Sequence, residues 1–265
     1  MSAWDDLARE LDAWAEAGRT ATLWWRDDDA TAPTAELERL LALQAEHGPP
    51  LALAVIPGRM ARELPARLDA HARAGHDISV LQHGYRHLNH APEGEKKMEL
   101  GAHRPAPLVV AELAAGWQAL DSVTRRLAVL VPPWNRIASR LVPMLPELGY
   151  RGLSGFGPRQ RAAPVAGLRQ VNTHVDPVDW RHGRRTLSDA AVAAQATQHL
   201  AARRSGRVDE DEATGLLTHH LLFDDGAWAA AAVLFRTASH PAARWLSARD
   251  MFEYAKPDPE NGGTP

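Results

Sequence analysis

The 265-residue sequence contains no cysteine. This absence excludes disulfide bonds, iron–sulfur clusters, zinc sites built on thiolates and a cysteine nucleophile. Histidine, in contrast, occurs thirteen times. A metal site in this chain would therefore use imidazole nitrogens and carboxylate oxygens as ligands.

Lysine is also scarce, since only Lys96, Lys97 and Lys256 accompany 27 arginines. None of the three lies in an apolar run that could form a strand, which argues against a Schiff-base lysine in a barrel. The formal net charge is −3, and no basic stripe stands out along the chain. We therefore expect no nucleic-acid partner.

Long apolar runs are missing as well. No stretch of about 18 apolar residues occurs, and the first residues are acidic and unlike a signal peptide. These features predict a soluble, cytoplasmic protein without a membrane partner.

What the sequence does contain is a regular alternation of strand-like and helix-like segments. Apolar runs predict strands over 21–25, 51–56, 78–81, 128–131, 150–154, 169–175 and 215–220. Helical spacing of apolar residues, or alanine-rich composition, predicts helices over 2–18, 34–47, 63–74, 110–127, 139–148, 190–204 and 242–255. This alternation indicates a parallel α/β fold, either a barrel or an open sheet. We expect one domain over 1–256, with an N-terminal helix within 1–20, and a disordered tail over 257–265.

Ionisable and aromatic side chains gather where these strands end, which is where parallel α/β folds collect their chemistry. Asp27, Asp28 and Asp29 follow the first strand. Adjacent carboxylates repel each other by about 1 kcal/mol per close pair even in water, and a bound cation would relieve this repulsion. One carboxylate could then bind the cation while a neighbour acts as a base. The alternative is a helix N-cap, because Asp is common just before a helix.

His83 and His87 follow the third strand. Residues four apart share one helical face, so both imidazoles could reach one ion. The alternative is a solvated, histidine-rich loop. With one aspartate they make three ligands and leave an open position, where Zn²⁺ or a similar ion would lower the pKa of water towards about 7 and polarise a carbonyl. The second carboxylate could take the proton.

His219 and His220 end the strand over 215–220. Adjacent residues of a regular strand point to opposite faces, so one of these imidazoles should face the site and could serve as a general acid. The alternative is a histidine whose hydrogen bonds are satisfied in the core.

Two further groups follow the strands at 128–131 and 169–175. Trp134 offers a flat apolar surface of the kind on which sugars stack, or it packs in a rigid turn with Arg136 nearby. His174 and Asp176 share a strand face, so Asp176 could orient a catalytic group. No nucleophile elbow, P-loop, dinucleotide fingerprint or HExxH motif occurs.

In this order the segments resemble the polysaccharide deacetylases of carbohydrate esterase family four. The resemblance covers residues 21–222. Five family motifs have counterparts here: the Asp-Asp pair in RDDDA at 26–30, H-[ST]-x-x-H in HGYRH at 83–87, R-x-P-[YFW] in VPPW at 131–134, an Asp/Trp segment in residues 176–180, and L-x-H in LTH at 217–219. It implies a deformed (β/α) barrel of about seven strands and a divalent metal held by Asp, His and His.

The triple aspartate leaves two registers for the first motif. If Ala30 stands for the family's glycine, the resemblance makes Asp28 the base and Asp29 a metal ligand. If Asp29 stands for that glycine, the base and ligand become Asp27 and Asp28. We prefer the first register, because it places Arg26 at the position of the family's leading residue.

The other roles implied by the resemblance are metal binding by His83 and His87 and proton donation by His219. At two positions this sequence departs from the family's motifs. Gly84 replaces the hydroxyl residue that usually steadies the histidine pair. Val131 replaces the arginine that normally orients the base, so another arginine would have to substitute; the candidates are Arg26, Arg104 and Arg136.

The sequence thus predicts a metal-dependent hydrolase, with zinc as the expected metal, that removes an acetyl group from an N- or O-acetylated sugar or glycoconjugate by metal-activated water. Contacts to the substrate or to the catalytic groups are expected from Arg26, Asp27, Trp134, Arg136, His174, Asp176 and His220. Two alternatives remain open. One is a barrel that binds carbohydrate without turning it over, which the missing arginine motivates. The other is a hydrolase of a non-sugar amide C–N bond.

Overall fold

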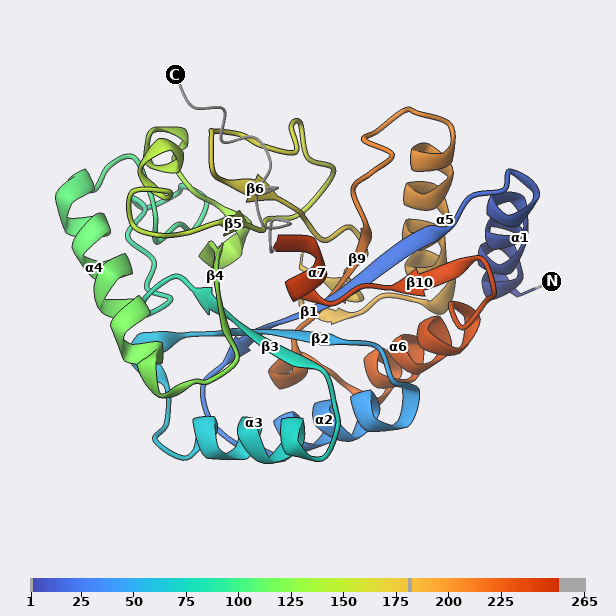
Figure 1. The fold of residues 1–265 in the computed structure, drawn as a ribbon, viewed down its shortest axis with the longest axis horizontal. Coiled ribbons are helices and arrows are strands. Elements are labelled where there is room, and N and C mark those ends of the chain that lie inside the picture. Colours follow the sequence, from blue (N-terminus) through green and yellow to red (C-terminus); the bar gives the residue numbers. More distant parts are fainter. Residues whose placement is uncertain (1, 181–182, 253–265) are drawn as a thin grey trace, which may run out of the picture.

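A computed structural model describes residues 2–180 and 183–252, which form an α/β barrel (Figure 1). Its strands are β1 (Ala21–Ala30), β2 (Leu51–Val55), β3 (Ile78–His83), β4 (Arg126–Val131), β5 (Gly152–Leu153), β6 (Arg169–Gln170) and β9 (Thr214–Thr218). Neighbours pair in parallel in the order β9, β1, β2, β3, β4, β5, β6. A further short strand, β10 (Ala243–Trp245), pairs with the start of β1.

The barrel closes through a narrow seam between β9 and the segment that follows β6. Val175 forms an isolated parallel bridge with Leu216, and the His174 N–H donates to the carbonyl of Gly215 at 2.7 Å. Because β9 also pairs along β1, seven strand positions complete the circle. The expected deformed barrel of about seven strands is confirmed, and the open sheet is excluded.

Side chains along the strands alternate between the barrel interior and the outer, helix-covered face. Trp24 packs in the interior cluster, whereas Trp25 packs in the outer one. The interior is closed on one side by α7 (Ala248–Phe252), because the Phe252 ring lies edge-on to Trp24 with centroids 6.1 Å apart. Strand β2 is buried at every position, as expected for a strand covered on both faces.

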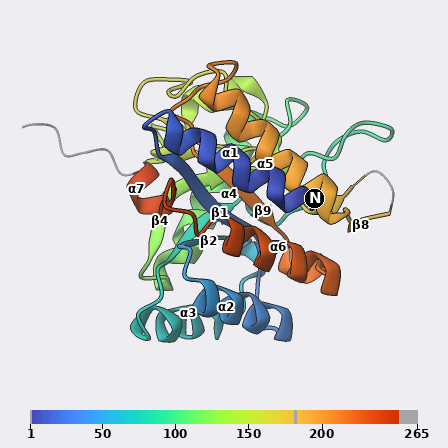
Figure 2. The same cartoon turned by 90° about the vertical axis from the view of Figure 1, so that its right-hand side faces the viewer.

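Helices cover the outside of the barrel (Figures 1 and 2). They are α1 (Ala3–Glu16), α2 (Ala35–His47), α3 (Leu64–Arg73), α4 (Ala106–Ala119), α5 (Asp189–Arg204) and α6 (Asp225–Thr237). Three begin where a hydroxyl side chain, that of Ser2, Thr34 or Ser188, accepts a backbone N–H of the first turn. In Figure 2, α1 lies along α5, while α2 and α3 lie together beneath the sheet.

Several predicted boundaries were wrong. The helix predicted over 110–127 ends by 122, because β4 already begins at Arg126, and the segment 139–148 forms a 3₁₀ turn, Ser139–Met144. The helix α6 was not predicted. The segment 242–255 contains β10 and α7 instead of one helix, because pairing with the start of β1 overrides its local pattern.

The predicted tail, 257–265, and the end of the segment 242–255 lie outside the described residues. Within the described part of the chain, no helix combines the length and the apolar character needed to cross a membrane.

Candidate active site

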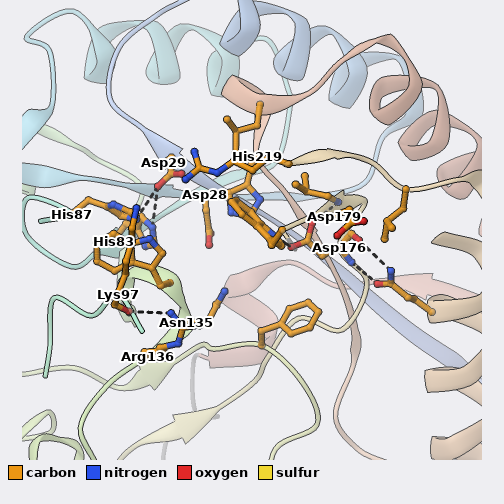
Figure 3. A pocket seen from close by; sticks show the side chains of 18 residues that line it. Asp28, Asp29, His83, His87, Lys97, Asn135, Arg136, Asp176, Asp179 and His219 are labelled. Atoms are coloured by element: carbon orange, nitrogen blue, oxygen red, sulfur yellow. Dashed lines mark hydrogen bonds and ion pairs between the residues drawn. The ribbon is translucent and has the colours of Figure 1, made fainter. Parts of the chain in front are cut away.

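The predicted site residues meet around a cavity of about 980 Å³ at the carboxyl ends of the strands (Figure 3). Its lining includes Asp28, Asp29, His83, His87, Trp134, Arg136, Asp176 and His219. Three residues expected near the substrate or catalytic groups, Asp27, His174 and His220, do not line it. Arg26 is fully buried directly behind Asp28.

The three aspartates take three different directions because β1 is irregular at its end. The pairing with β2 shifts register between Asp27 and Ala30, and Asp29 has φ 75°. This left-handed conformation is uncommon for residues other than glycine and marks a constrained position. It brings Asp29 into the cavity beside Asp28, whereas Asp27 faces away and accepts hydrogen bonds from Thr218 and His220.

Asp29 meets the two imidazoles that the sequence paired with it. Its Oδ1 lies 3.2 Å from His83 Nε2 and 3.3 Å from His87 Nε2. His83 Nδ1 lies 3.0 Å from the carbonyl oxygen of Val131. A carbonyl can only accept, so Nδ1 carries a proton and the Nε2 lone pair of neutral His83 faces the carboxylate.

Two acceptors that face each other at this distance require a cation or a proton between them. Burial acts against charge on both groups, yet their contacts leave the pKa of Asp29 below its usual range and the pKa of His83 raised. Burial, followed by the neighbouring His83, lowers the pKa of His87, which keeps its nitrogen lone pair available. The three ligand atoms lie within 4.8 Å of one another, so the site fits a divalent metal with two nitrogen ligands and one oxygen ligand.

A buried glutamate that the sequence did not reveal shapes the loop between the two histidines. Glu99 is 1% exposed, and its carboxylate accepts the backbone N–H groups of Tyr85 and Arg86 at 3.1 and 2.8 Å. Gly84 has φ 55°, and a Cβ there would lie 2.1 Å from Glu99 Oε2. The loop therefore requires glycine where the family resemblance expects a hydroxyl residue, and Glu99 holds the loop instead.

Arg26 contacts Asp28, the residue predicted to act as the base. Its Nε and Nη2 donate to the two oxygens of Asp28 at 2.8 and 3.0 Å, an arrangement that fixes the carboxylate plane. The guanidinium is held in turn by Ser154 Oγ at 2.6 Å and Asn135 Oδ1 at 2.7 Å. The sequence did not point to Ser154 or Asn135, because both contacts join segments more than 100 residues apart.

The other two candidate arginines are engaged elsewhere. Arg104 forms a two-pronged ion pair with Glu112 at 2.7 and 2.8 Å. Arg136 lines the cavity but donates to the backbone carbonyl of Lys97 at 3.0 Å. Of the three, Arg26 is the one that contacts Asp28.

His219 and His220 turn in opposite directions, as predicted for adjacent residues. Figure 3 shows His219 on the side of Asp28 away from His83 and His87. Its ring packs edge-on to Trp180 with centroids 4.8 Å apart. His220 lies behind the cavity, fully buried, with Nδ1 2.5 Å from Asp27. The pair therefore divides between the cavity and the core.

Asp176 lies in the cavity wall near His219 and holds Trp180 in place. Its Oδ2 accepts the Trp180 Nε1 proton at 2.6 Å, and its Oδ1 accepts the Val178 N–H at 2.9 Å. Burial raises the pKa of Asp176, although the nearby His219 acts in the opposite direction. No direct hydrogen bond between Asp176 and His219 occurs in the described part of the chain.

His174 belongs to a different cluster, and its predicted place at the site was wrong. Its Nε2 lies 3.3 Å from Glu212, and its ring stacks on His199 with centroids 3.5 Å apart. This cluster also contains two imidazoles and a carboxylate within ligand range. However, the Gly215 N–H donates to His174 Nδ1 at 3.0 Å, so a neutral His174 carries its proton on Nε2 and cannot bind a metal there.

The fold is shared with known deacetylases, although the identities are low. The chain is 18% identical to a candidate polysaccharide deacetylase from Mycobacterium smegmatis, with a TM-score of 0.62 over 88% of this chain and 89% of that one. A family 4 carbohydrate esterase from Streptomyces lividans in complex with acetate is 17% identical, with a TM-score of 0.53 over 84% and 90% of the two chains.

A third similar structure is a family 4 acetyl xylan esterase from Clostridium thermocellum in complex with a cobalt ion. It is 13% identical, with a TM-score of 0.54 over 87% of this chain and 90% of that one. No protein-family profile matches the chain. No curated protein matches its sequence either. The structural similarity therefore establishes the fold.

Proposed function

We propose that this protein is a metal-dependent hydrolase that removes an acetyl group from an N- or O-acetylated sugar or glycoconjugate. The observation that carries the proposal is the arrangement of Asp29 Oδ1 against the Nε2 atoms of His83 and His87 at the edge of a cavity. This donor set suits Zn²⁺, which we expect as the native metal. The fold shared with family 4 carbohydrate esterases supports the same reaction class.

Asp29, His83 and His87 would hold the metal, which when bound polarises the acetyl carbonyl and makes water acidic enough to react near neutral pH. Asp28 lies beside Asp29 in the cavity and accepts the proton of the attacking water. The two hydrogen bonds from Arg26 hold the Asp28 carboxylate in a fixed orientation for this transfer.

His219, on the other side of Asp28, donates a proton to the departing nitrogen or oxygen of the sugar. Water is thereby added across the C–N or C–O bond, and acetate and a free amine or hydroxyl are the products. Asp176 and Trp180 position the His219 ring through the hydrogen bond between them and the edge-on ring contact.

Aromatic surfaces around the cavity favour a sugar over a small aliphatic amide. Trp134 lies against His87 with ring centroids 4.2 Å apart, and Phe156 and Trp180 are 47% and 44% exposed in the cavity wall. Flat apolar surfaces beside polar groups are suited to stacking on sugar rings. The Streptomyces lividans esterase, with acetate bound in its structure, is consistent with acetyl removal on this fold.

The test combines metal analysis with acetate release from a panel of N- and O-acetylated sugars and simple amides. We expect one metal per chain and acetate from at least one sugar. His83→Ala should lose the metal while keeping the fold. His240→Ala is the matched control, because its imidazole contacts Asp12 on α1 at 3.1 Å and does not line the cavity.

The outcomes separate the alternatives. Unchanged metal content in His83→Ala contradicts the ligand assignment. Stoichiometric metal without acetate from any substrate favours a carbohydrate-binding barrel. Acetate from simple amides alone favours a non-sugar amide hydrolase.

A further inference from the structure

The cavity carries a positively charged corner that the proposed reaction does not use. Lys97 and Arg136 line the cavity on the side of His83 and His87 (Figure 3). We call this pair the cationic corner. Lys97 is one of only three lysines in the sequence.

Three acidic residues that line the cavity, Asp28, Asp29 and Asp176, have contacts away from this corner. Asp28 is paired with Arg26, and Asp29 faces the two imidazoles. Asp176 accepts hydrogen bonds from Trp180 and from the backbone on the opposite wall. Within residues 2–180 and 183–252, no carboxylate forms an ion pair with Lys97 or Arg136, and the Arg136 guanidinium donates to a backbone carbonyl.

The corner is built into the framework that holds the predicted metal ligands. Arg136 Nη1 donates to the Lys97 carbonyl at 3.0 Å, which ties the two segments together. A parallel bridge between Leu100 and Ile137 joins them again a few residues further on. Between these ties, Glu99 holds the loop that carries His87. The Arg136 guanidinium and the Lys97 backbone are thus held at a set place relative to the reacting centre.

We propose that the natural substrate carries an anionic group, a carboxylate or a phosphate, which binds in the cationic corner; this inference rests on the proposed deacetylation of a sugar in the same cavity. A guanidinium matches the two oxygens of either anion, and the lysine ammonium adds a flexible point charge. A cavity of about 980 Å³ has room for a charged sugar in addition to its acetyl group.

The first experiment measures binding without turnover. Glucose, glucuronate, glucose 6-phosphate and glucose 1-phosphate carry no acetyl group, so each can be titrated into the zinc-loaded protein and followed by calorimetry or ligand-observed NMR. We expect at least one anionic sugar to bind about tenfold or more tightly than glucose, which corresponds to about one added favourable charge contact. The carboxylate and phosphate probes distinguish the two anions.

Lys97→Ala and Arg136→Ala should each weaken binding of the preferred anionic sugar at least fivefold, and leave glucose binding unchanged. Lys96→Ala is the matched control, because this neighbouring lysine does not line the cavity. If no anionic sugar binds more tightly than glucose, or if both corner variants bind as the unaltered protein does, the proposal is wrong.

A second experiment links the corner to catalysis. In the unaltered protein, an anionic acetylated sugar should have a lower KM than its matched neutral sugar. In Lys97→Ala the two KM values should be similar, with little change in kcat. Absence of acetate from every substrate contradicts the deacetylase function and leaves the binding result interpretable. If acetate is released but the KM values of neutral and anionic substrates are equal, anion binding in the cationic corner is contradicted and the deacetylase function is not.

Discussion

At the scale of single residues, three identical side chains in a row acquire three different environments. Asp27 is buried against His220, Asp28 forms an ion pair with Arg26, and Asp29 faces His83. The sequence alone allowed two registers, because either Ala30 or Asp29 could stand for the family's glycine. In a regular strand Asp27 and Asp29 would lie on the same face. The left-handed backbone at Asp29 breaks that alternation and brings the second and third carboxylates into one cavity.

In the proposed reaction, the pairing of Arg26 with Asp28 would make Arg26 a positioning residue. Arg26→Lys keeps one positive charge but loses the two-pronged contact, so the carboxylate can rotate. We expect kcat to fall about 10–100-fold, because small misplacements of a catalytic group carry penalties of this size, while bound metal and KM change little. Steady-state acetate release and metal analysis measure this. Arg140→Lys is the control, since Arg140 donates to the backbone carbonyls of Ala102 and Arg104 and does not line the cavity. Metal loss or an unchanged kcat in Arg26→Lys contradicts the role.

At the scale of elements, local patterns predicted most helices and strands and the positions of the site motifs. Apolar spacing located α1 and α2, alanine-rich composition located α5, and apolar runs located β2 and β3. What local patterns could not show are contacts between distant segments. The three-residue strand β10 exists only because β1 lies beside it, and Glu99 is an ordinary loop glutamate until the loop at Tyr85 folds over it.

The loop held by Glu99 should control metal affinity without touching the metal. Glu99→Ala leaves the N–H groups of Tyr85 and Arg86 without their acceptor and frees the backbone that presents His87. We expect metal affinity to fall about 10–100-fold, as is typical when a group that orients a ligand is removed. Competition with a chromogenic chelator measures the affinity. Glu95→Ala, in the same loop but exposed, should bind metal like the unaltered protein, and equal affinities for all three proteins would refute the role of Glu99.

The cluster of His174, His199 and Glu212 supports the seam of the barrel. Glu212 is fully buried and accepts the backbone N–H groups of Arg159 and Asn172, both at 2.8 Å. Glu212→Gln replaces an acceptor with a donor, so one N–H loses its partner. We expect the free energy of unfolding to fall by about 1–3 kcal/mol, with the metal content unchanged. Denaturant unfolding and metal analysis test this, with the exposed Glu210→Gln as control; loss of metal would show that the cluster is a second metal site.

At the scale of the whole molecule, the barrel brings together groups that lie far apart in the sequence. The predicted metal ligands come from β1, β3 and the loop after β3, whereas His219 follows β9. Since β1 pairs with both β2 and β9, it is the element through which the two halves of the site are held in register. The strand order therefore explains why motifs separated by more than 100 residues line one cavity.

A metal that binds only the folded barrel must also stabilise it. At a free concentration of about 100 times Kd the stabilisation is about 2.7 kcal/mol, which raises Tm by about 5–10 °C for a chain of this size. Calorimetry of the protein with zinc and after chelation should show this shift. In His83→Ala the shift should vanish, because a ligand is lost, whereas Glu212→Gln should keep the full shift from a lower starting Tm. An equal shift in His83→Ala would place the stabilising ion somewhere other than the site formed by Asp29, His83 and His87.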